Sequence, residues 1–330
     1  MTYDKPHLTY DKQLDLLASR GMSYTDRQSA TRVLRAIGYY RLSAYTYVFR
    51  IPGDPRPDGR PGPRSDDFVP GTSMEAIVAL HDFDRALRRS LLDGLQQAEI
   101  GLRCMVGYQL GKVDPFGHTN RLSLDPAACA RINADGRDAF DKWMETYHRN
   151  IDDAKHEAYV QHFSAKYNRD MPVWVATELM TFGSLLWLHE LLPGRAAKRI
   201  SDNLGISDPK LLHRYLKALN VLRNHCAHNA RVWNRSTIYP PAKPPRNHVP
   251  DTLHHLRACD SDRLYFLAAL CAHFVTRLDA ASNWPRQFAT VVKKFPVTHG
   301  MTPESVMGFP NGWANLALWR YDPTTARKHA

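Results

Sequence analysis

A long helical pattern constrains this chain more than any other feature of its sequence. It begins at Thr72 or Ser73 and continues to Leu110, where Gly111 closes it. Its core positions recur at spacings of three, four and seven residues, at Leu80, Leu87, Leu91, Ala98, Leu102 and Met105. A helix this long can bury such a stripe only against other elements. We therefore predict a scaffold helix around which the rest of the chain packs.

Most other segments also show helical signals. Thr9 and Asp26 are placed to cap helices over 10–20 and 26–37, and Pro209 follows Asp208 at the start of another. The segment 39–49 also fits an alternating strand, but its spacing of three and four residues favours a helix. The remaining predicted helices cover 135–149, 154–167, 173–192, 208 to about 233, and 262–280. The fold class predicted is all-α, with a helical bundle, an N-terminal helical lobe and an irregular C-terminal tail.

One segment is incompatible with a helix or a central strand. Between Pro52 and Gly71 the chain has six prolines and four glycines. A solvated loop is favoured there over an arm that clamps RNA. The chain is accordingly divided into an N-terminal helical region (1–50), an exposed loop (51–72), a helical core (73–240) and a C-terminal helical region with a tail (241–330).

The charge balance points to a polyanionic partner. Lys and Arg number 44 against 33 Asp and Glu, which gives a net charge of +11. The five cysteines are scattered and include no C-x-x-C pair, so neither a disulfide framework nor a thiolate zinc site is indicated. The longest apolar run, 265–275, is too short to span a bilayer. We expect a cytoplasmic protein without a membrane anchor.

The predicted helix after Asp208 contains an unusual cation. A helical wheel places one stripe of residues on its core side, and every member is apolar or small except Arg223. This stripe consists of positions 212, 216, 219, 223, 226, 230 and 233. Arginine is rarely buried without a partner, so either an acid pairs with Arg223 or the stripe opens into a cleft. A neighbouring polar row consists of Asn224, His228, Arg231 and Arg235.

These residue types suit RNA cleavage without a metal. A histidine such as His228 can act as general base on a ribose 2′-hydroxyl or as general acid to the leaving 5′-oxygen, and Arg223 can stabilise charge on phosphorus. Arg and His late in a helix also commonly neutralise its carbonyl end, so a structural role is the alternative. Residues five apart on a helix are rotated by ~140°. We therefore expect a two-fold homodimer to complete the site, with a seam on the face of Arg223, Cys226 and Ala230.

The same residues carry a family resemblance. Arg223-Asn224 and His228 resemble the R-N-x-x-x-H form of the R-x4-6-H motif of HEPN-domain ribonucleases, and the segment 231–234 resembles the Abi-like abortive-infection proteins. Further similar segments lie in order along the chain, at 5–21, 37–45, 99–103, 172–178, 182–183 and 307–313. The loop between Arg50 and Thr72 is longer than the family needs. The resemblance implies an all-α HEPN core, metal-independent endoribonuclease chemistry, a role in phage defence and, through related RNA-guided effectors, a bound structured RNA.

The resemblance also assigns roles. It implies that Arg223 and His228 are catalytic and that Asn224 orients them. Glu99 and Arg103 match an acid and a base on one helix face, and we expect Glu99 to be the buried partner of Arg223. Supporting and RNA-contacting roles are expected for Arg231 and Arg235.

No cofactor is expected, and His225 with His228 lacks a third ligand for a metal. An antiphage endoribonuclease is the leading hypothesis, and a non-cleaving scaffold that binds a structured non-coding RNA is the alternative. A DNA-reading module in the N-terminal helices is the weakest, because no distinct recognition helix is evident.

Overall fold

The computed structural model describes residues 6–60 and 62–320, and throughout these residues the regular structure is helical. They form no strand, only isolated bridges between single residues. The all-α prediction is confirmed. Lys5, the first residue of the similar N-terminal segment, lies outside the described part of the chain. No helix in the described part combines the length and apolar character needed to cross a membrane.

The chain divides into two compact units. Unit 1 comprises residues 1–88 and 290–306, and unit 2 comprises residues 89–289 and 307–330. The division falls inside the long helix α4 (Met74–Gly111), between Arg88 and Arg89. This helix matches the scaffold helix predicted from the sequence almost residue for residue.

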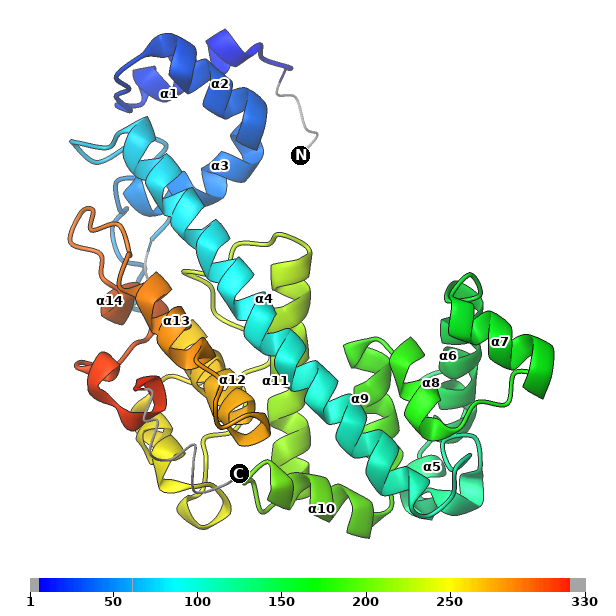
Figure 1. Cartoon of the computed structure of the whole chain (residues 1–330). Helices are drawn as coiled ribbons and strands as arrows, with labels where there is room; N and C mark the ends of the chain where they lie inside the picture. Colours follow the sequence, from blue (N-terminus) through cyan, green and yellow to red (C-terminus); the bar gives the residue numbers. More distant parts are fainter. Residues whose placement is uncertain (1–5, 61, 321–330) are drawn as a thin grey trace. The chain divides into compact units, whose positions relative to one another are not determined.

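Unit 1 contains the first helices, drawn in blue in Figure 1. They are α1 (Tyr10–Ser19), α2 (Arg27–Ile37), α3 (Tyr39–Thr46) and the 3-10 helix η1 (Tyr47–Phe49), followed by the first half of α4. Asp26 caps α2 as expected, because its carboxylate accepts a hydrogen bond from the Ser29 backbone N–H at 2.7 Å. Segment 39–49 is helical, so the choice of helix over strand is correct.

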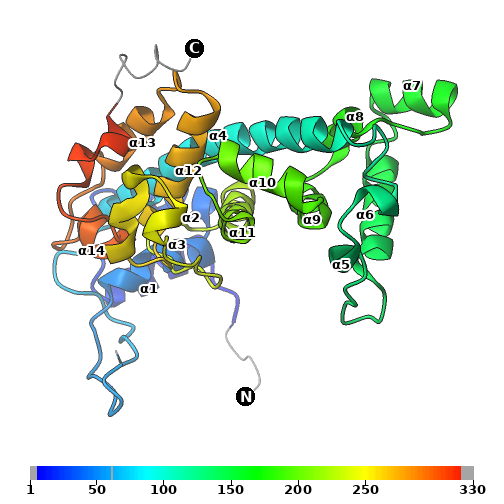
Figure 2. The ribbon, with the colours of Figure 1, turned by 90° about the horizontal axis from the view of Figure 1, so that it is seen from below.

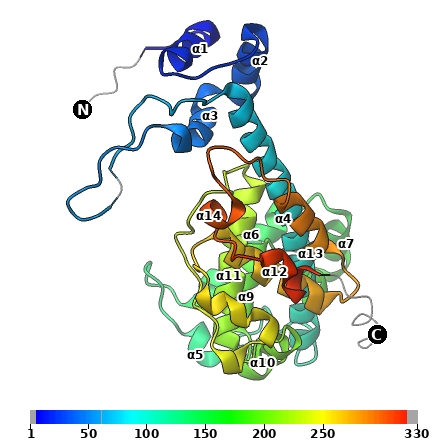
Figure 3. The same cartoon turned by 90° about the vertical axis from the view of Figure 1, so that its left-hand side faces the viewer.

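The Pro/Gly-rich loop leaves unit 1 as an extended excursion (Figure 3). Its base is ordered by pairing of its two arms, where the backbone N–H of Ile51 donates to Asp67 and that of Val69 donates to Phe49. Arg50 binds Asp66 at 2.9 Å, and Arg64 donates to the Arg50 carbonyl at 2.6 Å. These two arginines therefore stabilise the base of the loop.

Unit 2 holds the C-terminal half of α4 and most of the remaining helices (Figures 1 and 2). In it, α11 packs against α9, α10 and α12. Every residue of α12 from Leu264 to Val275 is buried, which makes this helix the centre of the core. The helices of this unit are α5 (Pro126–Cys129), α6 (Ala139–Asp153), α7 (Ala158–Tyr167), α8 (Val173–Leu179), α9 (Phe182–Leu191), α10 (Gly194–Asn203), α11 (Pro209–Ala227) and α12 (Leu264–Leu278).

The last part of the chain is mostly short helices. Helices α13 (Trp284–Val292) and α14 (Pro303–Met307) span the division between the units. The 3-10 helices of this part are η3 (Arg246–His248), η4 (Asp251–Ala258), η5 (Trp313–Asn315) and η6 (Ala317–Trp319), and η2 (Arg121–Ser123) lies earlier, between α4 and α5. The tail expected to be irregular is therefore folded up to residue 320. Trp313 and Trp319 are both buried.

Several predicted helix bounds are wrong, among them the start of α7, which begins at Ala158 and not at Ala154. The helix expected over 173–192 is two helices, because Met180 is extended and Thr181 caps α9 by accepting from the Ser184 backbone N–H at 3.2 Å. Helix α6 begins after its cap Asp138, and not at Asp135. Helix α11 ends at Ala227, well before Trp233. Helices α5 and α10 were not predicted.

Candidate functional site

The end of α11 is fixed by a specific backbone motif. Asn229 has a positive φ of 55° and occupies the left-handed position just beyond the cap residue His228. The Ala230 N–H donates to the His225 carbonyl at 2.9 Å, and the Asn229 N–H donates to the Cys226 carbonyl at 3.2 Å. This pair of bonds is the Schellman motif, in which asparagine is the usual substitute for glycine. The R-x4-H motif therefore straddles the helix end.

Arg223 lies on the last turns of α11 against a buried acid of α4. Its Nε is 3.4 Å from Glu99 Oε2, and the Glu99 side chain is only 6% exposed whereas that of Arg223 is 30% exposed. The pairing expected between these two residues is thus present. An arginine in the apolar stripe is tolerated because an acid meets it at the edge of the core.

Glu99 binds a second arginine on its own helix. Its Oε1 accepts a hydrogen bond from Arg103 Nη2 at 2.5 Å. The same nitrogen donates to the Met180 carbonyl at 2.6 Å, which is available because the chain is non-helical at that residue. One buried carboxylate therefore serves two guanidinium groups. This arrangement fixes Glu99 and presents the partly exposed Arg223 beside Asn224, whose Oδ1 accepts from Arg223 Nη1 at 3.4 Å.

His228 is the cap residue at the end of the helix. It is exposed, and its backbone N–H donates to the Asn224 carbonyl at 2.9 Å. Among the residues that the structure describes, no hydrogen bond or ion pair joins its ring to Arg223. One chain therefore supplies the two motif residues without bringing them into contact.

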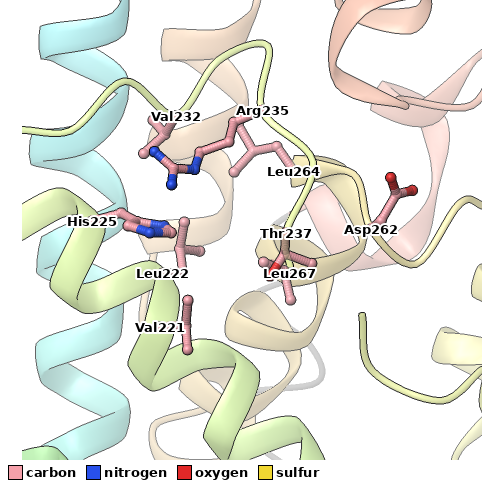
Figure 4. Close-up of a pocket in the computed structure, with 9 residues that line it drawn as sticks. All are labelled: Val221, Leu222, His225, Val232, Arg235, Thr237, Asp262, Leu264 and Leu267. Carbon is pink, nitrogen blue, oxygen red and sulfur yellow. The ribbon is translucent and has the colours of Figure 1, made fainter. Parts of the chain in front are cut away.

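His225 has a setting that its place in the motif did not predict. It lines a small pocket together with Arg235, Val221, Leu222, Val232 and Leu267, and Figure 4 shows its ring and the Arg235 guanidinium on the same side of that pocket. Burial lowers the pKa of His225, and the nearby Arg235 charge lowers it further. Both effects favour the uncharged form of the ring. The position of Arg235 after the helix end gave no signal of this in the sequence.

The polar row predicted along the helix does not exist as a row. Asn224 lies on α11 and His228 caps it, but Arg231 and Arg235 belong to the irregular segment that follows. Arg235 is exposed and Arg231 is half-buried. The same segment is anchored by the fully buried Trp233.

The predicted dimer seam also needs correction. Cys226 is only 4% exposed, so its side chain belongs to the core of unit 2 and cannot lie on an outer face with Arg223. The predicted seam requires a helix that continues to Trp233, whereas α11 ends before Ala230. Within the described ranges, no three His, Cys, Asp or Glu side chains gather as a metal site would require.

Comparison with known proteins supports one family. A family model described as Abi-like protein matches residues 32–234, which is more than half of the chain and includes Arg223 and His228. The match excludes the similar segments noted before residue 32 and after residue 234. Searches among curated proteins and among solved structures gave no significant match. On the extent of its match, the chain belongs to the Abi-like protein family.

Proposed function

We propose that this protein acts in abortive infection as a metal-independent endoribonuclease of the HEPN type. The observation that carries the proposal is the setting of Arg223, whose guanidinium is held by the buried carboxylate of Glu99 and remains partly exposed. A fixed, solvent-accessible guanidinium suits the stabilisation of negative charge on a phosphate. His228, exposed five residues later, is the proton-transfer group of the proposal.

In the proposed reaction the histidine takes the proton of the ribose 2′-hydroxyl, and the 2′-oxygen attacks the adjacent phosphorus. The bond from phosphorus to the 5′-oxygen breaks, and that oxygen receives a proton from a general acid. The products are a 2′,3′-cyclic phosphate and a free 5′-hydroxyl. The proton that is removed and the proton that is delivered balance, and the reaction consumes no oxidant, reductant or group carrier.

The lack of contact between Arg223 and His228 in one chain favours a composite site. We propose a two-fold homodimer in which the arginine of one protomer and the histidine of its partner face one phosphate. Mixing an Arg223→Ala chain with a His228→Ala chain tests this, because a mixed dimer would recover one intact pair. Activity should also fall on dilution. A monomer in light scattering that cuts RNA at every concentration contradicts the dimer.

The decisive experiment follows cleavage of a single-stranded RNA by the purified chain in EDTA. His228→Ala should slow cleavage by ~10²–10⁴-fold, the scale expected for loss of a general acid or base. His225→Ala is the comparison variant, because it removes the other histidine of the same motif and shows which of the two the reaction needs. Should His225→Ala fail and His228→Ala cut normally, the catalytic assignment is wrong.

The lack of contact between Arg223 and His228 also favours a second function, that of a non-cleaving scaffold for a structured RNA. The net charge of +11 and the exposed Arg235 support binding of RNA without cleavage. Copurification of a discrete RNA with a chain that causes growth arrest, but shows no cleavage in EDTA or with added Mg²⁺, favours this function. Growth arrest caused by the His228→Ala chain would also favour the scaffold function.

A further inference from the structure

Helix α11 carries exposed cations along the face that ends at His228. Lys210, Arg214 and Lys217 recur at spacings of four and three residues, and all three are exposed. Such spacing places side chains on one face of a helix. At ~100° per residue, His228 falls on this same face, and Arg223 is turned away from it by ~140°. Lys210, Arg214 and Lys217 are called the α11 cation stripe below.

No acid of α11 neutralises the stripe, because the 19 residues of this helix include no Asp or Glu. In the part of the chain that the structure describes, none of the three stripe residues forms an ion pair. Two acids beside the helix have other partners. Asp208, the helix cap, accepts from the Lys210 backbone N–H at 2.9 Å, and Glu190 binds Arg131 at 3.0 Å. The stripe is therefore a surface of positive charge that no acid compensates.

Another helix of unit 2 shows a different charge pattern. On α6, Lys142 binds Asp135 at 2.8 Å and Arg149 binds Glu145 at 2.9 Å. Charges of both signs there neutralise each other at the surface. A helix face that carries cations and no acids is instead the electrostatic pattern of a surface that binds a polyanion.

The arrangement of the stripe suits a chain of charges. With a rise of ~1.5 Å per residue, the three cations follow one another along the helix axis at intervals of ~6 and ~4.5 Å, and the face from Lys210 to His228 is ~27 Å long. A small anion would occupy only a fraction of this length. Consecutive phosphates of a nucleic-acid strand can contact each cation in turn.

The composition of α11 favours a nucleic acid over a lipid surface. Helices that bind membranes present large apolar side chains beside their cations. Every leucine of α11 and its one tyrosine, Tyr215, are buried in unit 2. Between Lys217 and His228 the face of the stripe carries only Val221 and Asn224, which are both partly buried.

We propose that the α11 cation stripe binds the phosphate backbone of a single-stranded RNA and directs the strand to His228. The choice of RNA rests on the proposed function, because only RNA offers a 2′-hydroxyl to the histidine at the end of the stripe. A single strand is favoured because side chains cannot read the deep, narrow major groove of an RNA duplex. In the proposed dimer, the stripe of each protomer delivers the strand to its own histidine, and the arginine of the partner completes the site.

Fluorescence anisotropy of a labelled single-stranded 2′-O-methyl RNA tests the proposal on the purified full chain. This RNA cannot be cut at its 2′-position, so the assay measures binding without cleavage. Each phosphate contact that is lost should reduce the slope of log K against log salt by ~0.7 and weaken binding ~4-fold at ~0.15 M salt. The test variant combines Lys210→Gln, Arg214→Gln and Lys217→Gln. Its slope should fall by ~2, and its binding should be ~50-fold weaker than that of the wild type.

A matched control removes the same charge from another surface of unit 2. It combines Arg137→Gln, Arg149→Gln and Arg169→Gln, whose arginines are exposed and bind acids in the folded chain. Such surface ion pairs contribute little to stability, so this control should fold. It should keep the wild-type affinity and salt slope, because its arginines do not contact the strand.

Three results would overturn the proposal. One is an unchanged affinity and salt slope in a triple stripe variant whose circular dichroism shows that it is folded. Another is an equal loss of binding in the matched control, since net charge alone would then attract the RNA. The third is tighter binding of duplex DNA, or of vesicles that contain phosphatidylserine, than of the single-stranded RNA, when this binding is lost in the stripe variant.

Cleavage of an unmodified RNA separates the stripe from the proposed function. If both proposals hold, the stripe variant should raise KM about as much as it weakens binding, and kcat should stay at the wild-type value. If the wild-type chain binds RNA through the stripe but does not cut it under any condition, the proposed cleavage is wrong and binding by the stripe stands.

Discussion

Replacement of Arg223 separates its proposed catalytic role from a structural one. In the Arg223→Ala chain, Glu99 keeps its 2.5 Å hydrogen bond from Arg103, so no buried carboxylate is left without a partner. The lost contact is 3.4 Å long and involves a side chain that is 30% exposed. Partly exposed ion pairs contribute little, and we expect the free energy of unfolding to fall by about 1 kcal/mol.

Glu99→Ala provides the contrast. It removes the carboxylate that faces both guanidinium groups, from a side chain only 6% exposed, and leaves Arg223 without its acid and Arg103 with only the more distant, exposed Glu178 at 4.0 Å. Loss of one partner from a buried pair costs about 3–5 kcal/mol. If Arg223 serves catalysis, Arg223→Ala should lose ~10²–10³-fold in cleavage rate. Arg223→Lys should fail almost as badly, because an ammonium cannot reproduce the planar fork.

Urea unfolding and the initial rate of RNA cleavage, measured on the same preparations, check both expectations. The reasoning is refuted if Arg223→Ala is destabilised as much as Glu99→Ala, because Arg223 would then hold the fold together. It is refuted equally if Arg223→Ala cuts RNA at the wild-type rate. Arg223→Lys that retains full activity would show that only the charge matters.

Three further expectations concern stability. Three buried histidines of unit 2 have a lowered pKa. Burial lowers the pKa of His118 and His273 to about 4 and that of His189 to about 3. In the unfolded chain these histidines take up protons near pH 6.5, whereas in the folded chain they stay uncharged until the pH approaches 4. The free energy of unfolding should therefore fall as the pH drops from 6.5 towards 4, by about 4 kcal/mol per pH unit near pH 5. Calorimetry at several pH values measures this slope, and a His118→Phe chain with an undiminished slope would contradict it. Asn229→Val should lower stability by about 1–2 kcal/mol because φ is 55° there, and Asn229→Gly should be tolerated better in the same urea assay. Gly94→Ala should cost about 1–3 kcal/mol and alter the tryptophan fluorescence, because the new methyl would lie 2.3 Å from Trp284 Cε2; an unchanged midpoint and spectrum would argue against that packing.

The sequence predicted the helices whose ends carry strong local signals. Asp26, Gly111 and Pro209 mark helix ends that the structure shows at or next to those residues. The prediction of helix ends failed where contacts between distant parts of the chain determine the local structure. Nothing local requires a break at Met180, yet the extended chain there exposes the carbonyl that Arg103 uses. The apolar positions Val232 and Trp233 continued the helical pattern, but they are buried from an irregular segment.

The site was predicted unevenly for the same reason. Glu99 and Arg223 are far apart in sequence; a cation in an apolar stripe called for an acid or a cleft, and the family resemblance singled out Glu99, which is the acid that the structure pairs with Arg223. The pocket that contains His225 and Arg235 depends on how the chain turns after α11. The turn is set by the left-handed Asn229, and a helical wheel that ignores the turn places all later side chains on incorrect faces.

The Schellman end of α11 has a consequence for the length of the motif. Arg223 is held in the helical register, whereas His228 lies at the cap, where the periodic backbone bonding stops. A residue inserted after Ala227 would lengthen a turn and would not rotate the rest of the helix, so its cost is that of a slightly longer loop. The number of residues between the arginine and the histidine of the motif can therefore change by one or two without disturbing the ion pair of Arg223 and Glu99. An insertion between Arg223 and Cys226 would instead rotate the last turn of the helix by about 100° and move the buried Cys226 out of the core.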